Sequence, residues 1–200
     1  ETAPAVDLVN TQEIIYISSL DKKLYAFVKD GKLKWSTVLG DVSYSAPALA
    51  SNGIIYLGAD DGKLYAINTN GTITWTFQAG DKIRSSPVID NEGTIYFTAF
   101  DGKLYAVGNN GAVRWTYTLT ATPSTLTITP TMGNDGTIYA PTDNGLLIAV
   151  NTDGTLKGNF TLGAATSAAP AIDSTGTLYV SADSNIYAIV SNSRGLAPSA

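Results

Sequence analysis

The fold is decided by Pro47-Ala-Leu-Ala-Ser-Asn-Gly53-Ile-Ile-Tyr56, which continues into Asp61-Gly62-Lys-Leu-Tyr65-Ala66 and Asn70-Gly71-Thr-Ile-Thr-Trp75. Its short apolar runs are rich in Ile, Tyr, Thr and Trp, residues that favour strands, and Gly-containing turns separate the runs. Asn-Gly and Asp-Gly turns join antiparallel strands tightly, because Gly adopts a positive φ at no steric cost. The stretch therefore predicts a meander of four antiparallel strands.

This pattern occurs five times along the chain. The tyrosine of its Leu-Tyr-Ala run, or the residue in that place, recurs at spacings of 40, 40, 43 and 39 residues: Tyr25, Tyr65, Tyr105, Ile148 and Tyr187. A period near 40 residues without helical periodicity excludes helical solenoids and indicates a β-propeller, in which each meander is one radial blade. We predict a single all-β domain over residues 1–200, with repeats at about 4–46, 47–86, 87–129, 130–169 and 170–200.

The repeats differ at three places. The first has a longer opening at Asn10-Thr-Gln-Glu13, and the third has three extra residues around Ala121-Thr-Pro123-Ser-Thr. The fifth reaches Ala200 just where its Trp-bearing strand should begin. We therefore expect the last blade to lack its outer strand and to expose an unpaired strand edge.

Composition excludes several classes of function. The net charge is −5 with only 12 Lys plus Arg, so the basic stripe of a nucleic-acid-binding protein is missing. No apolar run approaches the roughly 18 residues that a membrane helix needs. The chain has no Cys and no His, which excludes disulfides, Ser-His and Cys-His catalysis and soft metal sites. The abundance of Thr, Ser, Asn and Gly is typical of an exported protein.

The run Ala66-x-Asn68-x-x-Gly71-x-x-x-Trp75, seen again from Ala26 to Trp35 and from Ala106 to Trp115, resembles the tryptophan-docking motif of the PQQ-like β-propeller repeat family. The resemblance covers nearly the whole chain. It implies that Trp35, Trp75 and Trp115 are structural residues packed between neighbouring blades. Gly158 stands in place of this Trp in the fourth repeat, and the fifth repeat ends before it.

That family contains quinoprotein dehydrogenases, which are longer and use a calcium-bound quinone, an acidic base and often adjacent cysteines. It also contains non-catalytic exported propellers, including the lipoprotein of the outer-membrane barrel assembly machine. This chain resembles the second kind, since it has no cysteine pair, no recognisable Glu-Asn-Asp calcium set and only five repeats. The resemblance therefore implies a non-enzymatic protein without catalytic, cofactor-binding or metal-binding residues.

Candidate binding residues lie on one predicted face, where the loops between repeats meet the second turn of each meander. They are Tyr44, Lys82, Arg84 and Phe100. Tyr44 and Arg84 each stand three residues before a Pro, a position at the mouth of the central channel. Solvated loop residues remain an alternative interpretation. The aspartates of the second turns, such as Asp61, are interpreted as hairpin residues rather than metal ligands.

The recurring tyrosines are interpreted as interblade core: Tyr16, Tyr56, Tyr96, Tyr139 and Tyr179. The leading functional hypothesis is a secreted, periplasmic or cell-surface scaffold that binds proteins, including itself through the open edge of the last blade. One alternative is a fragment of a quinone-dependent dehydrogenase. Another is a carbohydrate-binding propeller of the envelope, in which Tyr44 and Phe100 would stack on sugars.

Overall fold

The computed structural model of the chain describes residues 2–7, 13–120, 127–166 and 168–191. Within these ranges the regular elements are strands, and they form five antiparallel sheets in chain order. The prediction of an all-β propeller architecture is confirmed. Most of the long opening at residues 10–13, the insertion around residues 121–125 and the end of the chain beyond residue 191 lie outside the described residues.

Each of the first four sheets is a meander of four strands, and the fifth contains three. The first two sheets contain β1 (Ala5–Asp7), β2 (Ile14–Ser19), β3 (Lys23–Val28) and β4 (Leu33–Val38), then β5 (Ala48–Leu49), β6 (Ile54–Gly58), β7 (Lys63–Asn68) and β8 (Ile73–Gln78). The third and fourth contain β9 (Val88–Ile89), β10 (Ile95–Thr98), β11 (Lys103–Val107) and β12 (Val113–Thr118), then β13 (Thr131–Met132), β14 (Ile138–Pro141), β15 (Leu146–Val150) and β16 (Leu156–Thr161). The fifth contains β17 (Ala171–Ile172), β18 (Thr177–Ala182) and β19 (Asn185–Val190).

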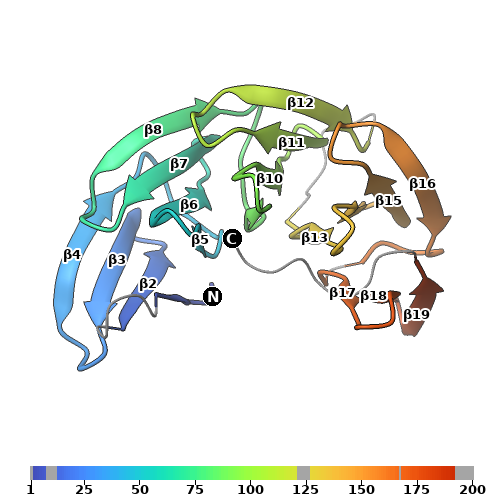
Figure 1. The fold of residues 1–200 in the computed structure, drawn as a ribbon, viewed down its shortest axis with the longest axis horizontal. Coiled ribbons are helices and arrows are strands. Elements are labelled where there is room, and N and C mark those ends of the chain that lie inside the picture. Colours follow the sequence, from blue (N-terminus) through green and yellow to red (C-terminus); the bar gives the residue numbers. More distant parts are fainter. Residues whose placement is uncertain (1, 8–12, 121–126, 167, 192–200) are drawn as a thin grey trace.

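The five sheets stand side by side along an open arc (Figure 1). The long fourth strands β4, β8, β12 and β16 form the outer rim, and the short first strands point toward the centre. The first and fifth sheets lie at opposite ends of the arc and are not adjacent. The described sheets therefore do not close into a ring by themselves.

The hydrophobic core is divided into four clusters, one between each pair of consecutive sheets. In the first, Tyr16 and Leu24 of one sheet pack with Leu57 and Ile67 of the next. The equivalent tyrosines of the first four sheets are at most 2% exposed, which confirms their interpretation as core residues: Tyr16, Tyr56, Tyr96 and Tyr139. For Tyr179 that interpretation is wrong in the described part of the chain, where the side chain is 41% exposed.

Each tryptophan connects its own sheet to the following one. The indole Nε1 donates a hydrogen bond to a carbonyl in the third turn of the next sheet, from Trp35 to Thr69 at 2.8 Å, from Trp75 to Asn109 at 3.0 Å and from Trp115 to Thr152 at 2.7 Å. The ring also packs against the core tyrosine of its own sheet, as between Trp35 and Tyr16 with centroids 5.8 Å apart. Three of the four interfaces between sheets therefore share one polar and aromatic contact.

Hydroxyl residues join the sheets near the centre of the arc. The bonds run from Ser18 Oγ to Ser45 O at 2.7 Å, from Ala46 N to Ser86 Oγ at 2.9 Å, from Ser86 N to Thr129 Oγ1 at 3.0 Å and from Thr131 Oγ1 to Pro170 O at 2.6 Å. Small side chains are needed here because the first strands converge. The Ser and Thr residues satisfy backbone groups that have no ladder partner.

The third-turn glycines provide a test of the tryptophan contact. Gly31 and Gly71 both have positive φ, but a Cβ on Gly71 would lie 2.9 Å from the Trp35 ring, whereas one on Gly31 would meet nothing within 4 Å. Gly31→Ala is expected to cost about 1 kcal/mol for the left-handed backbone alone. Gly71→Ala has the same backbone cost and must in addition displace the Trp35 ring, so it is expected to lower the free energy of unfolding by about 2–4 kcal/mol. Urea unfolding measures both, and equal losses would contradict a close contact at Trp35.

Candidate functional site

The candidate site is built where the loops between sheets lie on the second hairpin turn of the following sheet. Asp60 N–H donates to Val42 O at 2.9 Å, and Phe100 N–H donates to Lys82 O at 3.0 Å. Ile83 is fully buried under its loop and donates its N–H to Ala59 O at 3.1 Å. These backbone bonds hold successive loops against one face of the arc.

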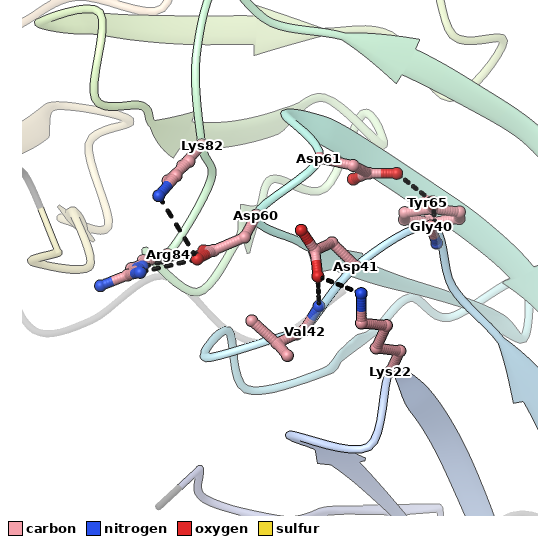
Figure 2. A network of polar contacts seen from close by, with 9 residues as sticks. All are labelled: Lys22, Gly40, Asp41, Val42, Asp60, Asp61, Tyr65, Lys82 and Arg84. Carbon is pink, nitrogen blue, oxygen red and sulfur yellow. Dashed lines mark hydrogen bonds and ion pairs between the residues drawn. The ribbon is translucent and has the colours of Figure 1, made fainter.

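Arg84 is the centre of this site. Its Nε and Nη2 donate to the two carboxylate oxygens of Asp60 at 2.8 and 2.6 Å. Its Cζ lies 4.3 Å from the centroid of the Tyr44 ring and 5.2 Å from that of Phe100. Lys82 Nζ approaches Asp60 Oδ2 at 3.9 Å. The structure thus brings together all four residues singled out in the sequence. It adds Asp60 as the residue that both Lys82 and Arg84 contact (Figure 2).

The charges of this Arg84 cluster, defined as Tyr44, Asp60, Lys82, Arg84 and Phe100, do not cancel. The Asp60 side chain is buried, at 7% exposure, and a buried carboxylate needs a paired cation. The bidentate bond with Asp60 raises the pKa of Arg84, which stays charged at all working pH values. Lys82 adds a second positive charge, so the cluster is cationic within a chain of net charge −5. Arg84 extends its remaining nitrogen away from Asp60 (Figure 2).

A second polar group lies beside the cluster, between the first and second sheets. Asp41 Oδ1 accepts a hydrogen bond from Val42 N–H at 2.9 Å and pairs with Lys22 Nζ at 2.8 Å. The hydrogen bond from Lys22 is the main cause that lowers the pKa of Asp41. This exposed pair connects the loop after β4 to the second turn of the first sheet (Figure 2).

The second-turn aspartates have a further role that the sequence interpretation missed. Tyr65 Oη donates to Asp61 Oδ2 at 2.5 Å and accepts from Gly40 N–H of the preceding loop at 2.7 Å. Tyr105 makes the same pair of bonds, with Asp101 and with Gly80 N–H. The glycine is required by close approach, since a Cβ on Gly40 would lie 2.1 Å from Asp61 Oδ2. Each such Asp-Tyr-Gly unit joins two sheets.

The fourth sheet replaces both ends of this unit together. Ile148 occupies the tyrosine position and cannot donate or accept, and Thr120 occupies the position of Gly40 and Gly80. At this one junction Thr replaces Gly and Ile replaces Tyr, and the paired exchange is visible in the sequence. It shows only when repeats are compared across their junctions rather than within each unit.

A separate pocket of about 290 Å³ lies between the third and fourth sheets, among the first and third turns. It is lined by acidic residues including Asp90 and Asp153, with Arg114 at one side. Arg114 Nη1 lies 3.6 Å from Glu92 Oε2. Gly133, which has no side chain, stands here where the neighbouring repeats have Asp90 and Asp173. The four candidate residues are not among those that line this pocket.

The resemblance to quinoproteins raises calcium-bound quinone as a cofactor. Such a site needs several oxygen ligands that converge on the calcium ion. In the described ranges, no three His, Cys, Asp or Glu residues are grouped so that they could hold a metal ion. The described residues therefore do not fit this cofactor.

Radial meanders of this kind, joined by a tryptophan that reaches the next third turn, define a PQQ-like β-propeller. The model of a protein family described as outer membrane protein assembly factor BamB matches residues 3–189. The chain belongs to this family.

Among solved structures, BamB from Moraxella catarrhalis is similar, with a TM-score of 0.78 and 17% sequence identity. The match covers 94% of this chain but 57% of the BamB chain. A search of curated proteins found no match. In the part of the chain that the structure describes, no helix is long and apolar enough to cross a membrane.

The Asp-Tyr-Gly unit is tested by removing one hydroxyl. Tyr65→Phe leaves Gly40 N–H and Asp61 Oδ2 without this partner and is expected to lower the unfolding free energy by about 1–3 kcal/mol. Tyr25→Phe is the matched control, because among the described residues the Tyr25 hydroxyl bonds Asp21 alone, on an exposed turn, and a clearly smaller loss is expected. Similar losses from both variants, measured by denaturant unfolding, would show that the bond to Gly40 contributes nothing.

The same hydroxyl predicts a pH dependence. Burial first, and then the hydrogen bond to Asp61, raise the pKa of Tyr65 from 10.0 to about 12. The neutral phenol therefore stabilises the fold below pH 10, and this contribution is lost as the pH rises from 10 to 12. Stability measured across that range is expected to fall less steeply in Tyr65→Phe than in the wild type. Equal falls in stability between pH 10 and 12 for both proteins would refute the assignment of this pH dependence to Tyr65.

Proposed function

We propose that this chain is a non-catalytic β-propeller module that binds other proteins through the Arg84 cluster. The observation that carries the proposal is the convergence of Arg84, Lys82, Tyr44 and Phe100 on one exposed loop face. Arg and Tyr are enriched where protein interfaces gain most of their binding energy. The absence of His and Cys agrees with a role in binding rather than catalysis.

We propose in addition that the protein is exported from the cytoplasm. The family model is described as an outer membrane protein assembly factor, and the similar solved structure is a BamB. By analogy, we propose that this chain works in the cell envelope or on the cell surface, as part of an assembly of proteins. A composition rich in Thr, Ser, Asn and Gly supports an exported location.

The charges and the aromatic ring of the Arg84 cluster indicate which side chains a protein partner would bring to it. Lys82 and Arg84 together exceed the charge of Asp60, so an acidic side chain is attracted to the free side of the guanidinium. Tyr44 is 41% exposed and offers a ring next to that charge. A partner segment with an acidic residue beside an apolar one therefore fits the cluster.

The two alternatives have less support. A carbohydrate would stack on Tyr44 and Phe100, but the Arg84 guanidinium already lies over both rings. A quinone-dependent dehydrogenase would need a calcium-binding group of acidic residues, which the described residues do not provide. A protein partner can bind the cluster while the contacts of Arg84 with Asp60, Tyr44 and Phe100 stay in place.

Two substitutions that keep the Arg84–Asp60 pair intact test the binding surface. Tyr44→Ala and Lys82→Glu are each expected to weaken binding of envelope proteins, captured from the source organism and then purified, by at least about tenfold. Lys32→Glu is the control, because it makes the same charge change at an 81% exposed lysine in a third turn, away from the cluster. Titration calorimetry with the purified partner gives the affinities. Equal effects of Lys82→Glu and Lys32→Glu would locate the partner elsewhere.

The dehydrogenase alternative has its own test. Titration of the chain with pyrroloquinoline quinone and calcium is expected to give no saturable change in absorbance or in tryptophan fluorescence. Omitting calcium provides the control for non-specific quinone adsorption. Saturable, calcium-dependent binding at one quinone per chain would revive the enzyme hypothesis.

We infer further that the module associates with itself through its last sheet. Among the described residues, β19 has no strand on its outer side, whereas β3, β7, β11 and β15 are each paired there. An unpaired strand edge is a site to which another chain can add a strand.

A further inference from the structure

Asparagine precedes glycine at four hairpin turns of this chain, all within the described residues: Asn52-Gly53, Asn70-Gly71, Asn110-Gly111 and Asn144-Gly145. An Asn-Gly pair is prone to spontaneous deamidation, because glycine has no side chain that hinders attack by its own backbone nitrogen. Asparagine is accordingly one of the residues that proteins adapted to high temperature use less. The four pairs place one reaction in four different surroundings.

The reaction is a cyclisation followed by a hydrolysis. The glycine nitrogen attacks the asparagine Cγ and forms a new C–N bond, while the side-chain nitrogen leaves as ammonia with the proton of the attacking N–H. Water then opens the cyclic imide at one of its two carbonyl groups, which gives either aspartate or isoaspartate. Both products carry a carboxylate in place of a neutral amide, and in isoaspartate the main chain is one carbon longer.

The local hydrogen bonds of the turn oppose this reaction. Gly53 N–H donates to Ala50 O at 2.9 Å, and Asn52 Oδ1 accepts from Ile54 N–H at 3.1 Å. The turns at residues 70–71 and 110–111 make the same two bonds, at 2.8 and 3.0 Å and at 2.9 and 3.1 Å. Since both reacting groups are occupied, each turn must open before the ring can close. Local bonds therefore do not distinguish these three asparagines.

Contacts with a neighbouring sheet do distinguish them. A Cβ on Gly71 would lie 2.9 Å from the Trp35 ring, and one on Gly111 would lie 3.1 Å from the Trp75 ring. The same two indoles donate hydrogen bonds to the carbonyl group just before each asparagine. These two third turns therefore cannot open without disturbing the junction between two sheets.

The pair in the fourth sheet is enclosed by main chain. Gly145 is buried, and a Cβ on it would lie 3.0 Å from backbone atoms of Ala164 in the loop after β16. Its N–H makes the longest turn bond of the four, at 3.4 Å to Thr142 O. Local bonding alone thus makes Asn144 the most reactive asparagine, whereas enclosure by the loop protects it.

The first turn of the second sheet has no comparable enclosure. A Cβ on Gly53 would meet one atom within 4 Å, the methyl group of Thr69 at 3.6 Å, which is ordinary contact. Asn52 is exposed, and its side chain contacts its own sheet at Ile54 N–H and at the Tyr56 hydroxyl. This turn can open while the junctions with both neighbouring sheets stay in place.

We propose that Asn52 is a site of spontaneous deamidation in the folded protein, and that Trp35 and Trp75 protect Asn70 and Asn110 from the same reaction. The modification adds a negative charge to a chain whose net charge is already −5. It lies in a first turn, at the opposite end of the strands from the Arg84 cluster. The protein therefore becomes more acidic with age at one defined turn, while its loop face is unchanged.

Peptide mapping by mass spectrometry measures the four rates in folded protein that is incubated in warm, mildly alkaline buffer. The same chain unfolded in urea gives the reference rate of each pair, and the ratio of the two rates is its protection. Protection of Asn52 is expected to be lower than that of the other three by at least about tenfold. Labelling with a protein isoaspartyl methyltransferase counts the isoaspartate independently, and Asn52→Gln is expected to remove most of that label. Protection of Asn144 equal to or below that of Asn52 would overturn the role of enclosure.

Trp35→Phe tests the protection by tryptophan, because it removes the indole hydrogen bond to the turn that holds Asn70. Deamidation of Asn70 is expected to rise by about threefold or more, the effect of one lost hydrogen bond, while Asn110 in the same molecule keeps its rate. Trp75→Phe is the reciprocal variant and is expected to accelerate Asn110 alone. Circular dichroism shows whether each variant is folded. Unchanged rates, or equal acceleration of both asparagines in both folded variants, would refute the protection.

Discussion

The burial of sheet faces against their neighbours is the interaction on which the rest of this structure depends. Each repeat is too thin to have a core of its own, and its apolar side chains find partners only in the repeats on either side. The tryptophan contacts, the hydroxyl bonds near the centre and the Asp-Tyr-Gly units all act across these junctions. Stability therefore grows with the number of junctions.

The loop face uses this scaffold to hold an ion pair in place. Asp60 is fixed by its turn and by the backbone bond to Val42, and Arg84 comes from the next loop along the arc. Two consecutive sheets must pack correctly before the guanidinium meets its carboxylate and its two aromatic neighbours. The geometry of the cluster is thus set by the spacing between the two sheets.

The architecture could be predicted because its signals are local: glycines set the turns, and a period near 40 sets the repeat. The open arc could not be predicted from the sequence. The curvature of the arc depends on the packing angles between sheets, which no short segment encodes. The candidate residues Tyr44, Lys82, Arg84 and Phe100 followed from their places in the repeat. Asp60 was overlooked as their partner because an aspartate in a hairpin turn already has a local explanation. Tyr179 was wrongly assigned to the core because its environment depends on a neighbour and not on its own sequence.

The exchange of Tyr and Gly for Ile148 and Thr120 has a consequence for how such a chain can change by duplication. A copy of the second repeat inserted after the third would set the Tyr65 hydroxyl against a threonine side chain where a glycine leaves room for it. Repeats that look interchangeable are therefore matched to their neighbours, since the Tyr or Ile of one repeat requires the Gly or Thr of the loop before it. Inserting a repeat at this junction therefore places a tyrosine where the preceding loop has no glycine to receive it.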